Sequence, residues 1–222
     1  MPSIKQLILP ILIACFSLLN VTAFVFAQSD QQLLDQLISG IETTYSNKGF
    51  SADFNQLSRL NALDITEKAS GKAFFSHPGK MKWEYRSPDV HQVITNGRTL
   101  WIYKPDENQV IQGNADRLFK SGAGGGFLSD ISMIRKHFEI KLKEANEQSV
   151  QIDMVSRTQN PDIASIVLTV DRKTFEITQV VTYNMYDDAT RFDFSNIRFD
   201  QFDDSLFEFV PPAKSDVIQM SE

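Results

Sequence analysis

The sequence is poor in the residues that build reactive centres. Its 222 residues include one cysteine, Cys15, and three histidines, His77, His91 and His137. The histidines lack the HExxH spacing of a zinc site, and no GxSxG elbow of a serine hydrolase occurs. The sequence therefore predicts a binding protein and not an enzyme, with no metal and no cofactor.

The sequence also has no excess of basic residues. The chain has 22 Lys and Arg residues against 28 Asp and Glu residues, a net charge of −6. This balance argues against binding to nucleic acid and against electrostatic docking on anionic membranes. The length is sufficient for one core without disulfide or zinc support. We expect one domain over residues 28–222, acting as a monomer.

The first 27 residues carry a single charged side chain, that of Lys5. An apolar run over residues 7–26 leads to Ala27 in a small-residue cleavage pattern, which predicts a removable secretory signal peptide over residues 1–27. Two alternatives stay open. The run approaches the ~20 residues of a transmembrane anchor, and the Leu-Ile-Ala-Cys ending at Cys15 fits the lipobox of an acylated lipoprotein.

The most informative stretch lies between residues 77 and 105. From Lys80 to Arg86, apolar and charged residues alternate as in a half-buried strand. Asn96-Gly97 predicts a hairpin with a type I′ turn. Because a shift of one residue reverses the faces of a strand, the sequence leaves open which pair of the return strand shares the face of the first strand. The aromatic face of the first strand is Met81, Trp83 and Tyr85, and the candidate pairs are Leu100/Ile102 and Trp101/Tyr103.

The rest of the chain is predicted as strands, with helices in two places. Leu33, Leu34, Leu37, Ile38 and Ile41 have the spacing of one face of a helix that begins near residue 29 and ends near Tyr45. About ten strands in meander order follow, among them residues 50–56 and 71–76. Residues 114–138 interrupt them with two short helices around a glycine-rich hinge at 121–126.

Several of these motifs together resemble the LolA family of periplasmic lipoprotein carriers. The resemblance covers most of the chain after residue 27, and its specific parts are the His-Pro-Gly-Lys-Met-Lys-Trp strand and the Asn-Gly-Arg-Thr-Leu-Trp hairpin. It implies a mainly β (α+β) fold, an incomplete antiparallel β-barrel whose open side is covered by a helical lid. The other motifs are F-x-x-x-F-x-Q (Phe50, Phe54, Gln56), G-x-x-x-F (Gly71, Phe75) and the terminal F-x-F-x-P-P (residues 207–212).

The resemblance implies a periplasmic chaperone that takes acylated lipoprotein cargo from an inner-membrane ABC-type release complex. The cargo then passes to the outer-membrane receptor LolB, and a LolB-like receptor acylated at Cys15 is the alternative function. A hydrolase or transferase of envelope lipid or glycan, and a sensor of mislocalised lipoproteins, are more distant alternatives. The expected acyl-chain cavity is Phe54, Met81, Trp83, Tyr85, Leu100, Trp101, Ile102 and Tyr103, and the expected lid residues are Phe119, Phe127, Leu128, Ile131 and Ile134.

One position departs from the family pattern. Members usually carry an arginine before the proline where this chain has His77-Pro78. The resemblance implies that the arginine forms hydrogen bonds with the backbone of the lid. Histidine has fewer donors, so either His77 acts as a weaker lid latch or closure relies on apolar contacts, and we expect the lid to be held more loosely. The alternative is an exposed histidine at a strand end with no role in closure.

Overall fold

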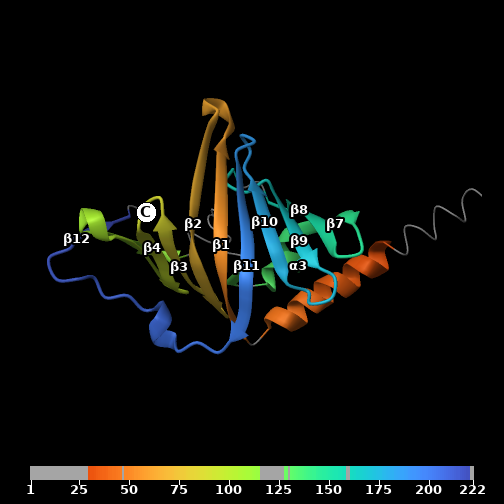
Figure 1. The fold of residues 1–222 in the computed structure, drawn as a ribbon, viewed down its shortest axis with the longest axis horizontal. Helices are drawn as coiled ribbons and strands as arrows, with labels where there is room; N and C mark the ends of the chain where they lie inside the picture. The colour runs from red at the N-terminus through yellow and green to blue at the C-terminus, as the bar shows by residue number, and fades with distance from the viewer. Residues whose placement is uncertain (1–29, 47, 116–127, 130, 159–160, 221–222) are drawn as a thin grey trace, which may run out of the picture.

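The computed structural model describes residues 30–46, 48–115, 128–129, 131–158 and 161–220. Within these residues twelve strands form one open sheet in the order β12-β6-β5-β4-β3-β2-β1-β11-β10-β9-β8-β7. A helix over residues 30–45 precedes them (Figure 1). The mainly β fold, the open barrel-like sheet and the N-terminal helix confirm the prediction. The strands are β1 (Gly49–Leu60), β2 (Ile65–Ser76), β3 (Lys80–Ser87), β4 (His91–Asn96), β5 (Thr99–Lys104), β6 (Gln109–Asn114), β7 (Phe138–Ala145), β8 (Ser149–Ser156), β9 (Ser165–Asp171), β10 (Ile177–Tyr183), β11 (Ala189–Asp200) and β12 (Asp216–Gln219).

Two antiparallel meanders make up this sheet. Strands β1 to β6 form one and β7 to β11 the other, and they join where β1 pairs with β11. As a result β6 and β7, which are consecutive in the chain, lie in different halves, far apart in the strand order. The segment between them, residues 115–137, therefore connects the two halves in sequence and is called the crossover. Its last part is the short helix α3 (Met133–His137).

The helix over residues 30–45 packs on the second meander. Tyr45, at its end, is 1% exposed and accepts a hydrogen bond from the Ile177 backbone N–H of β10 (2.8 Å). Gly40 lies so close to the Phe175 ring that a Cβ there would come within 2.3 Å of it. None of the helices among the described residues is long and apolar enough to cross a membrane. The predicted apolar face is mostly correct, since Leu34, Leu37, Ile38 and Ile41 are buried and Leu33 is half-buried.

The C-terminal segment covers the face of the first meander that points away from the main core. After β11 the chain forms the 3₁₀ turn η5 (Asp204–Phe207), and Phe207 is fully buried. Phe209 then packs against Tyr103 (ring centroids 5.2 Å apart) and Trp101 (6.4 Å). The segment ends in β12, which pairs in parallel with β6. The terminal F-x-F-x-P-P motif therefore supports the back of the sheet.

Two hairpins extend beyond the core. β1 and β2 stay paired from the core out to Leu60 and Ile65, well past the strands predicted at 50–56 and 71–76. The turn between β10 and β11 projects beside them (Figure 1), and the Asn61 N–H donates to Asp188 Oδ1 (2.7 Å). Large apolar side chains are exposed at these two hairpin ends, namely Leu60, Leu63, Ile65, Met185 and Tyr186.

Other differences from the prediction are local. The structure has twelve strands instead of about ten, and one of the additional strands, β12, carries no alternation of buried and exposed residues. In the β4–β5 hairpin only Gly97 has a positive φ (+89°), and it occupies the first central position of a two-residue turn, as in type II′ and not type I′. Of the two short helices predicted within 114–138, the structure describes only the last part, which includes α3. The glycine-rich run 121–126 lies outside the described residues.

Candidate functional site: an aromatic inner face under the crossover

The strand register gives the successive rows of side chains that together form the inner face of the sheet. Directly paired residues point to the same side, so the rows can be read across β3, β2, β1 and β11. The rows change from apolar to polar along the strands, toward the projecting hairpins. In order they are Met81–Phe75–Phe50, then Trp83–Ala73–Ala52, then Tyr85–Gly71–Phe54–Phe194, then Gln56–Phe192, and last Ser58–Thr190.

Trp83 lies at the centre of this face. Its side chain is 1% exposed, and the two residues in its row on β2 and β1, Ala73 and Ala52, are small enough to leave room for the indole. Aromatic rings surround it at edge-on or tilted angles typical of favourable aromatic pairs. The centroid distances are 4.8 Å to Phe54, 4.9 Å to Phe192, 5.4 Å to Phe75 and 6.2 Å to Phe194, and Tyr85 stacks at 6.3 Å.

The described end of the crossover covers this aromatic face. Leu128, Ile131 and Ile134 are at most 3% exposed and join the buried cluster that contains Trp83. The sequence placed all three in the lid, and the structure brings them over the sheet. Phe119 and Phe127, the other two expected lid residues, lie outside the described residues.

Polar contacts hold the same segment at its two sides. The Ile131 backbone N–H donates to His77 Nε2 (3.3 Å), and the Gly79 N–H donates to the Ser129 carbonyl oxygen (3.1 Å). On the other side, Arg135 of α3 forms an ion pair with Glu42 of the first helix (2.8 Å). His77 thus contacts the backbone of the crossover as an acceptor, whereas the implied arginine would be a donor.

The β4–β5 register decides between the two pairs that the sequence left open. Trp83 pairs with Val93, which pairs with Ile102, and Thr95 pairs with Leu100. Leu100 and Ile102 therefore share the inner face with Trp83. Trp101 and Tyr103 point the other way, into a separate cluster with Ile94 and Val110 under Phe209. Their inclusion among the cavity residues is corrected, because alternate residues of a strand face opposite sides.

Sequence reasoning missed several members of the inner face. Phe192 and Phe194 of β11 lie against Trp83, although their alternation was visible in the sequence. Gln56 accepts a hydrogen bond from the Tyr85 hydroxyl (2.9 Å) and donates to Ser58 Oγ (2.9 Å). No periodic signal marks this polar chain, since it depends on a β1–β3 contact across β2. Burial raises the pKa of Tyr85 to about 12, so its hydroxyl stays protonated and able to donate near neutral pH.

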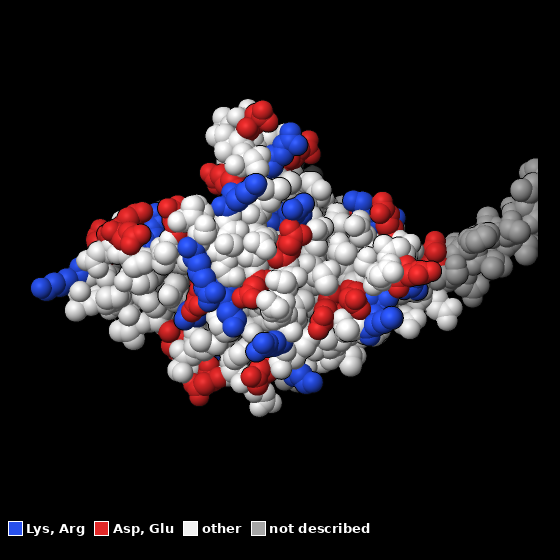
Figure 2. Space-filling view, in the orientation of Figure 1, with Lys and Arg blue, Asp and Glu red and all other residues white. Residues whose placement is uncertain are grey.

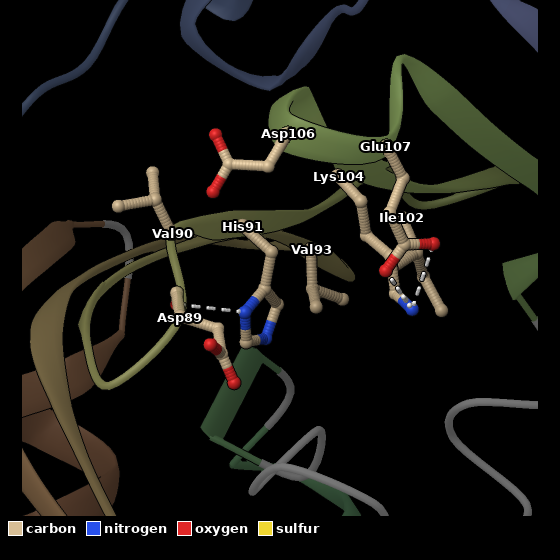
Figure 3. Close-up of a pocket in the computed structure, with 8 residues that line it drawn as sticks. All are labelled: Asp89, Val90, His91, Val93, Ile102, Lys104, Asp106 and Glu107. Atoms are coloured by element: carbon tan, nitrogen blue, oxygen red, sulfur yellow. Dashed lines mark hydrogen bonds and ion pairs between the residues drawn. The ribbon is translucent and has the colours of Figure 1, made fainter.

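A pocket of about 380 Å³ opens beside the aromatic cluster (Figure 3). Val93 and Ile102 of the inner face line it, and the His91 ring stacks on Tyr85 at a centroid distance of 4.1 Å. Asp89, Asp106 and the Lys104–Glu107 ion pair (3.0 Å) form its polar surroundings. The volume falls at the low end of the roughly 300–1,000 Å³ typical of ligand pockets. Through Val93 and Ile102 the inner face thus continues into an open recess with a mixed apolar and charged lining.

Neither the face drawn in Figure 2 nor the side-chain clusters of the described residues indicate a polyanionic or metal ligand. Basic and acidic side chains are interspersed over the face drawn in Figure 2. Among the described residues, no three side chains of His, Cys, Asp or Glu come together in a way that could hold a metal ion. The arrangement therefore offers apolar and aromatic surface, with a few hydrogen-bonding groups at one end.

Comparison with known proteins agrees with this geometry. The family model of the outer membrane lipoprotein carrier protein LolA matches residues 46–210. Outer-membrane lipoprotein carrier proteins of Coxiella burnetii (strain CbuK_Q154) and Azotobacter vinelandii are 28% and 25% identical over 205 residues, covering 91% of this chain and 93% and 96% of theirs. An uncharacterized conserved protein from Thermus thermophilus shares the fold with a TM-score of 0.55 and 10% identity, over 86% of this chain and 99% of its own. The chain belongs to the LolA family of outer membrane lipoprotein carrier proteins.

Proposed function

We propose that this protein is a periplasmic carrier that binds the acyl chains of lipoproteins. It receives them from an inner-membrane ABC-type release complex and delivers them to an outer-membrane receptor. The observation that carries the proposal is the aromatic inner face around Trp83, covered by a separate segment of the chain. Family membership supports the same role, because the matching relatives are named as carriers of this kind.

The physical requirement explains why such a face needs a cover. Each methylene buried from water contributes about 0.8 kcal/mol, so a lipoprotein with two or three acyl chains is held firmly in a membrane. A carrier must offer comparable apolar area, yet large exposed apolar patches lead to aggregation. Leu128, Ile131 and Ile134 occupy the inner face in this structure. In the proposed cycle these side chains give way to the acyl chains.

His77 and Gly79 then have a defined part in the cycle. Both belong to the turn between β2 and β3, and both form hydrogen bonds with the covering segment, at Ile131 and Ser129. A single bond of this kind contributes only about 0.5–1.5 kcal/mol, so these two favour the closed state without preventing opening. The proposed latch at His77 therefore adds a modest bias to a closure that rests mainly on apolar contacts.

The test is extraction of a lipoprotein from the inner membrane. Spheroplasts carrying a radiolabelled lipoprotein are incubated with the secreted protein, and label is measured in the supernatant by size-exclusion chromatography. We expect a soluble complex of carrier and lipoprotein. Val93→Glu, which places a charge on the half-buried inner face, should reduce the yield, while Val210→Glu at an 85% exposed position should not. Label that stays in the spheroplasts with the unmodified protein would reject the proposal.

The alternative of a membrane-anchored receptor is decided by mass. Residues 1–27 lie outside the described residues, so the proposal that they are a removed signal peptide depends on the intact mass of the protein in the periplasmic and membrane fractions. A soluble species that begins at Gln28 supports the carrier. A membrane species that begins at an acylated Cys15 would make the protein a receptor.

A further inference from the structure

The indole N–H of Trp83 is a buried donor to which the described structure provides no acceptor. Its nitrogen, Nε1, is inaccessible to solvent and forms no hydrogen bond among the described residues. The surrounding rings of Phe54, Phe75 and Phe192 can offer at most a weak N–H···π contact. Buried polar groups in folded proteins are nearly always paired, so an unpaired one at the centre of a candidate site requires an explanation.

The polar groups in the rows beside Trp83 have partners, although His137 Nε2 of α3 is likewise buried without one among the described residues. The Tyr85 hydroxyl donates to Gln56, Gln56 donates to Ser58, and the Tyr45 hydroxyl accepts from the Ile177 N–H. A phenylalanine at position 83 would supply an aromatic ring without the unpaired donor. The indole therefore brings one additional capability to this face, which is the donation of a single hydrogen bond in an apolar environment.

A lipid ligand can supply the missing acceptor. Hydrocarbon has none, but the ester or amide that begins an acyl chain has a carbonyl oxygen at the junction between chain and head. We propose that Trp83 Nε1 donates to this carbonyl and so sets the depth of the acyl chain on the inner face. The inference rests on the proposed function, and it adds the group of the ligand that is recognised and the residue that recognises it.

The polarity of the inner face gives the ligand a direction. On one side of the Trp83 row lie Met81, Phe75 and Phe50, which are at most 4% exposed. On the other side the rows lead through Tyr85 to Gln56 and then to Ser58 and Thr190, whose hydroxyls lie 3.3 Å apart. With the carbonyl at Trp83, the chain extends toward the Phe50–Phe75 stack and the head faces the projecting hairpins.

Two lysolipids that differ only in the carbonyl provide the test. Palmitoyl-lysophosphatidylcholine has an ester at the start of its chain, and hexadecyl-lysophosphatidylcholine has an ether there. Both are titrated below their micelle concentrations into the secreted protein by calorimetry. We expect the ester to bind about 2- to 12-fold more tightly, which corresponds to the about 0.5–1.5 kcal/mol of one net hydrogen bond.

Two matched variants assign the preference. Trp83→Phe keeps an aromatic ring and removes the donor, so it should bind ester and ether equally. Trp101→Phe makes the same change on the opposite face of the sheet and should keep the preference. An equal affinity in the unmodified protein, or a preference that survives in Trp83→Phe, would overturn the assignment. Binding of both lysolipids without preference leaves the carrier function standing, while binding of neither overturns both proposals.

An infrared measurement tests whether the bound carbonyl accepts a hydrogen bond, and it can refute the proposal with the unmodified protein alone. The carbonyl stretch of the bound ester should lie at lower frequency than that of the same ester in a hydrocarbon solvent, because the carbonyl accepts a hydrogen bond. The shift should be present in Trp101→Phe. A carbonyl band at the hydrocarbon position in the unmodified protein would contradict the proposal even if Trp83→Phe failed to fold.

Discussion

Removal of the His77 side chain should loosen the covering segment without displacing it. His77 Nε2 accepts a hydrogen bond from the Ile131 backbone N–H at 3.3 Å, and Ile131 is 3% exposed. In His77→Ala this amide becomes a buried donor without its acceptor, which costs about 1–3 kcal/mol. The segment should therefore open about 5- to 150-fold more often.

The segment should nonetheless remain mostly closed. Leu128, Ile131 and Ile134 are almost completely buried, and each buried side chain of this size contributes about 1.5–3 kcal/mol. The apolar contribution exceeds that of one hydrogen bond, even after the entropy of ordering is subtracted. We therefore expect faster opening in His77→Ala with little change in the midpoint of global unfolding.

Amide hydrogen exchange measures this opening directly. The protection of the peptide over residues 128–137 is compared by mass spectrometry in the unmodified protein and in three variants. His77→Ala should lose protection by the factor given above. His77→Gln should retain most of it, because its amide oxygen can accept from Ile131. His91→Ala removes a histidine that contacts Tyr85 instead of this segment and should have no effect. Unchanged protection in His77→Ala, or equal loss in His77→Gln, would refute the reasoning.

Two further predictions concern the sheet itself. Gly71→Ala should reduce the free energy of unfolding by about 1–3 kcal/mol in a urea titration, because a Cβ there would meet the Glu84 carbonyl oxygen at 2.0 Å. Gly113→Ala should reduce it less, because the new methyl group would meet the movable Met220 side chain. Equal losses would contradict this. Burial raises the pKa of Tyr85 to about 12 in the folded state, above its ordinary 10.0, so the folded protein retains a proton that the unfolded chain releases. Stability should therefore fall as the pH rises from about 10 to about 12, and the fall should be smaller in Tyr85→Phe. Equal slopes in urea titrations of the two proteins would exclude Tyr85 as a cause.

Residue pattern was sufficient for the parts of the fold that have one buried face. The alternation around Trp83 and the helical spacing around Ile38 correspond to a strand and a helix that bury those residues. The same pattern could not orient β5, because Leu100/Ile102 and Trp101/Tyr103 are both apolar. Both faces of this strand are covered, one by the core and the other by Phe209. Only the pairing of β5 with β4 distinguishes them.

The outer parts of the sheet were less predictable for a physical reason. Residues 57–60 and 65–70 form paired strands with exposed side chains on both faces at their outer end, so no hydrophobic alternation marks them. β12 is exposed at all four positions and exists through its pairing with β6, more than 100 residues earlier in the chain. Non-local pairing of this kind leaves no trace in a short window of sequence. The hydrogen bond between Ile131 and His77 is non-local in the same way, and only the resemblance had suggested the position.

The junction between the two meanders has a consequence for folding. Within each meander, pairs form between strands that are neighbours in the chain, but the β1–β11 pair joins Gly49–Arg59 to Ala189–Asp200. Closing so long a loop costs more entropy than closing a hairpin, so this pair should form after the hairpins of the two meanders. The rings of Phe54 and Trp83 lie on one side of the junction and those of Phe192 and Phe194 on the other. The aromatic face is thus completed only when the two meanders join, and a chain halted before this step would have two half-sheets and a face that lacks Phe192 and Phe194.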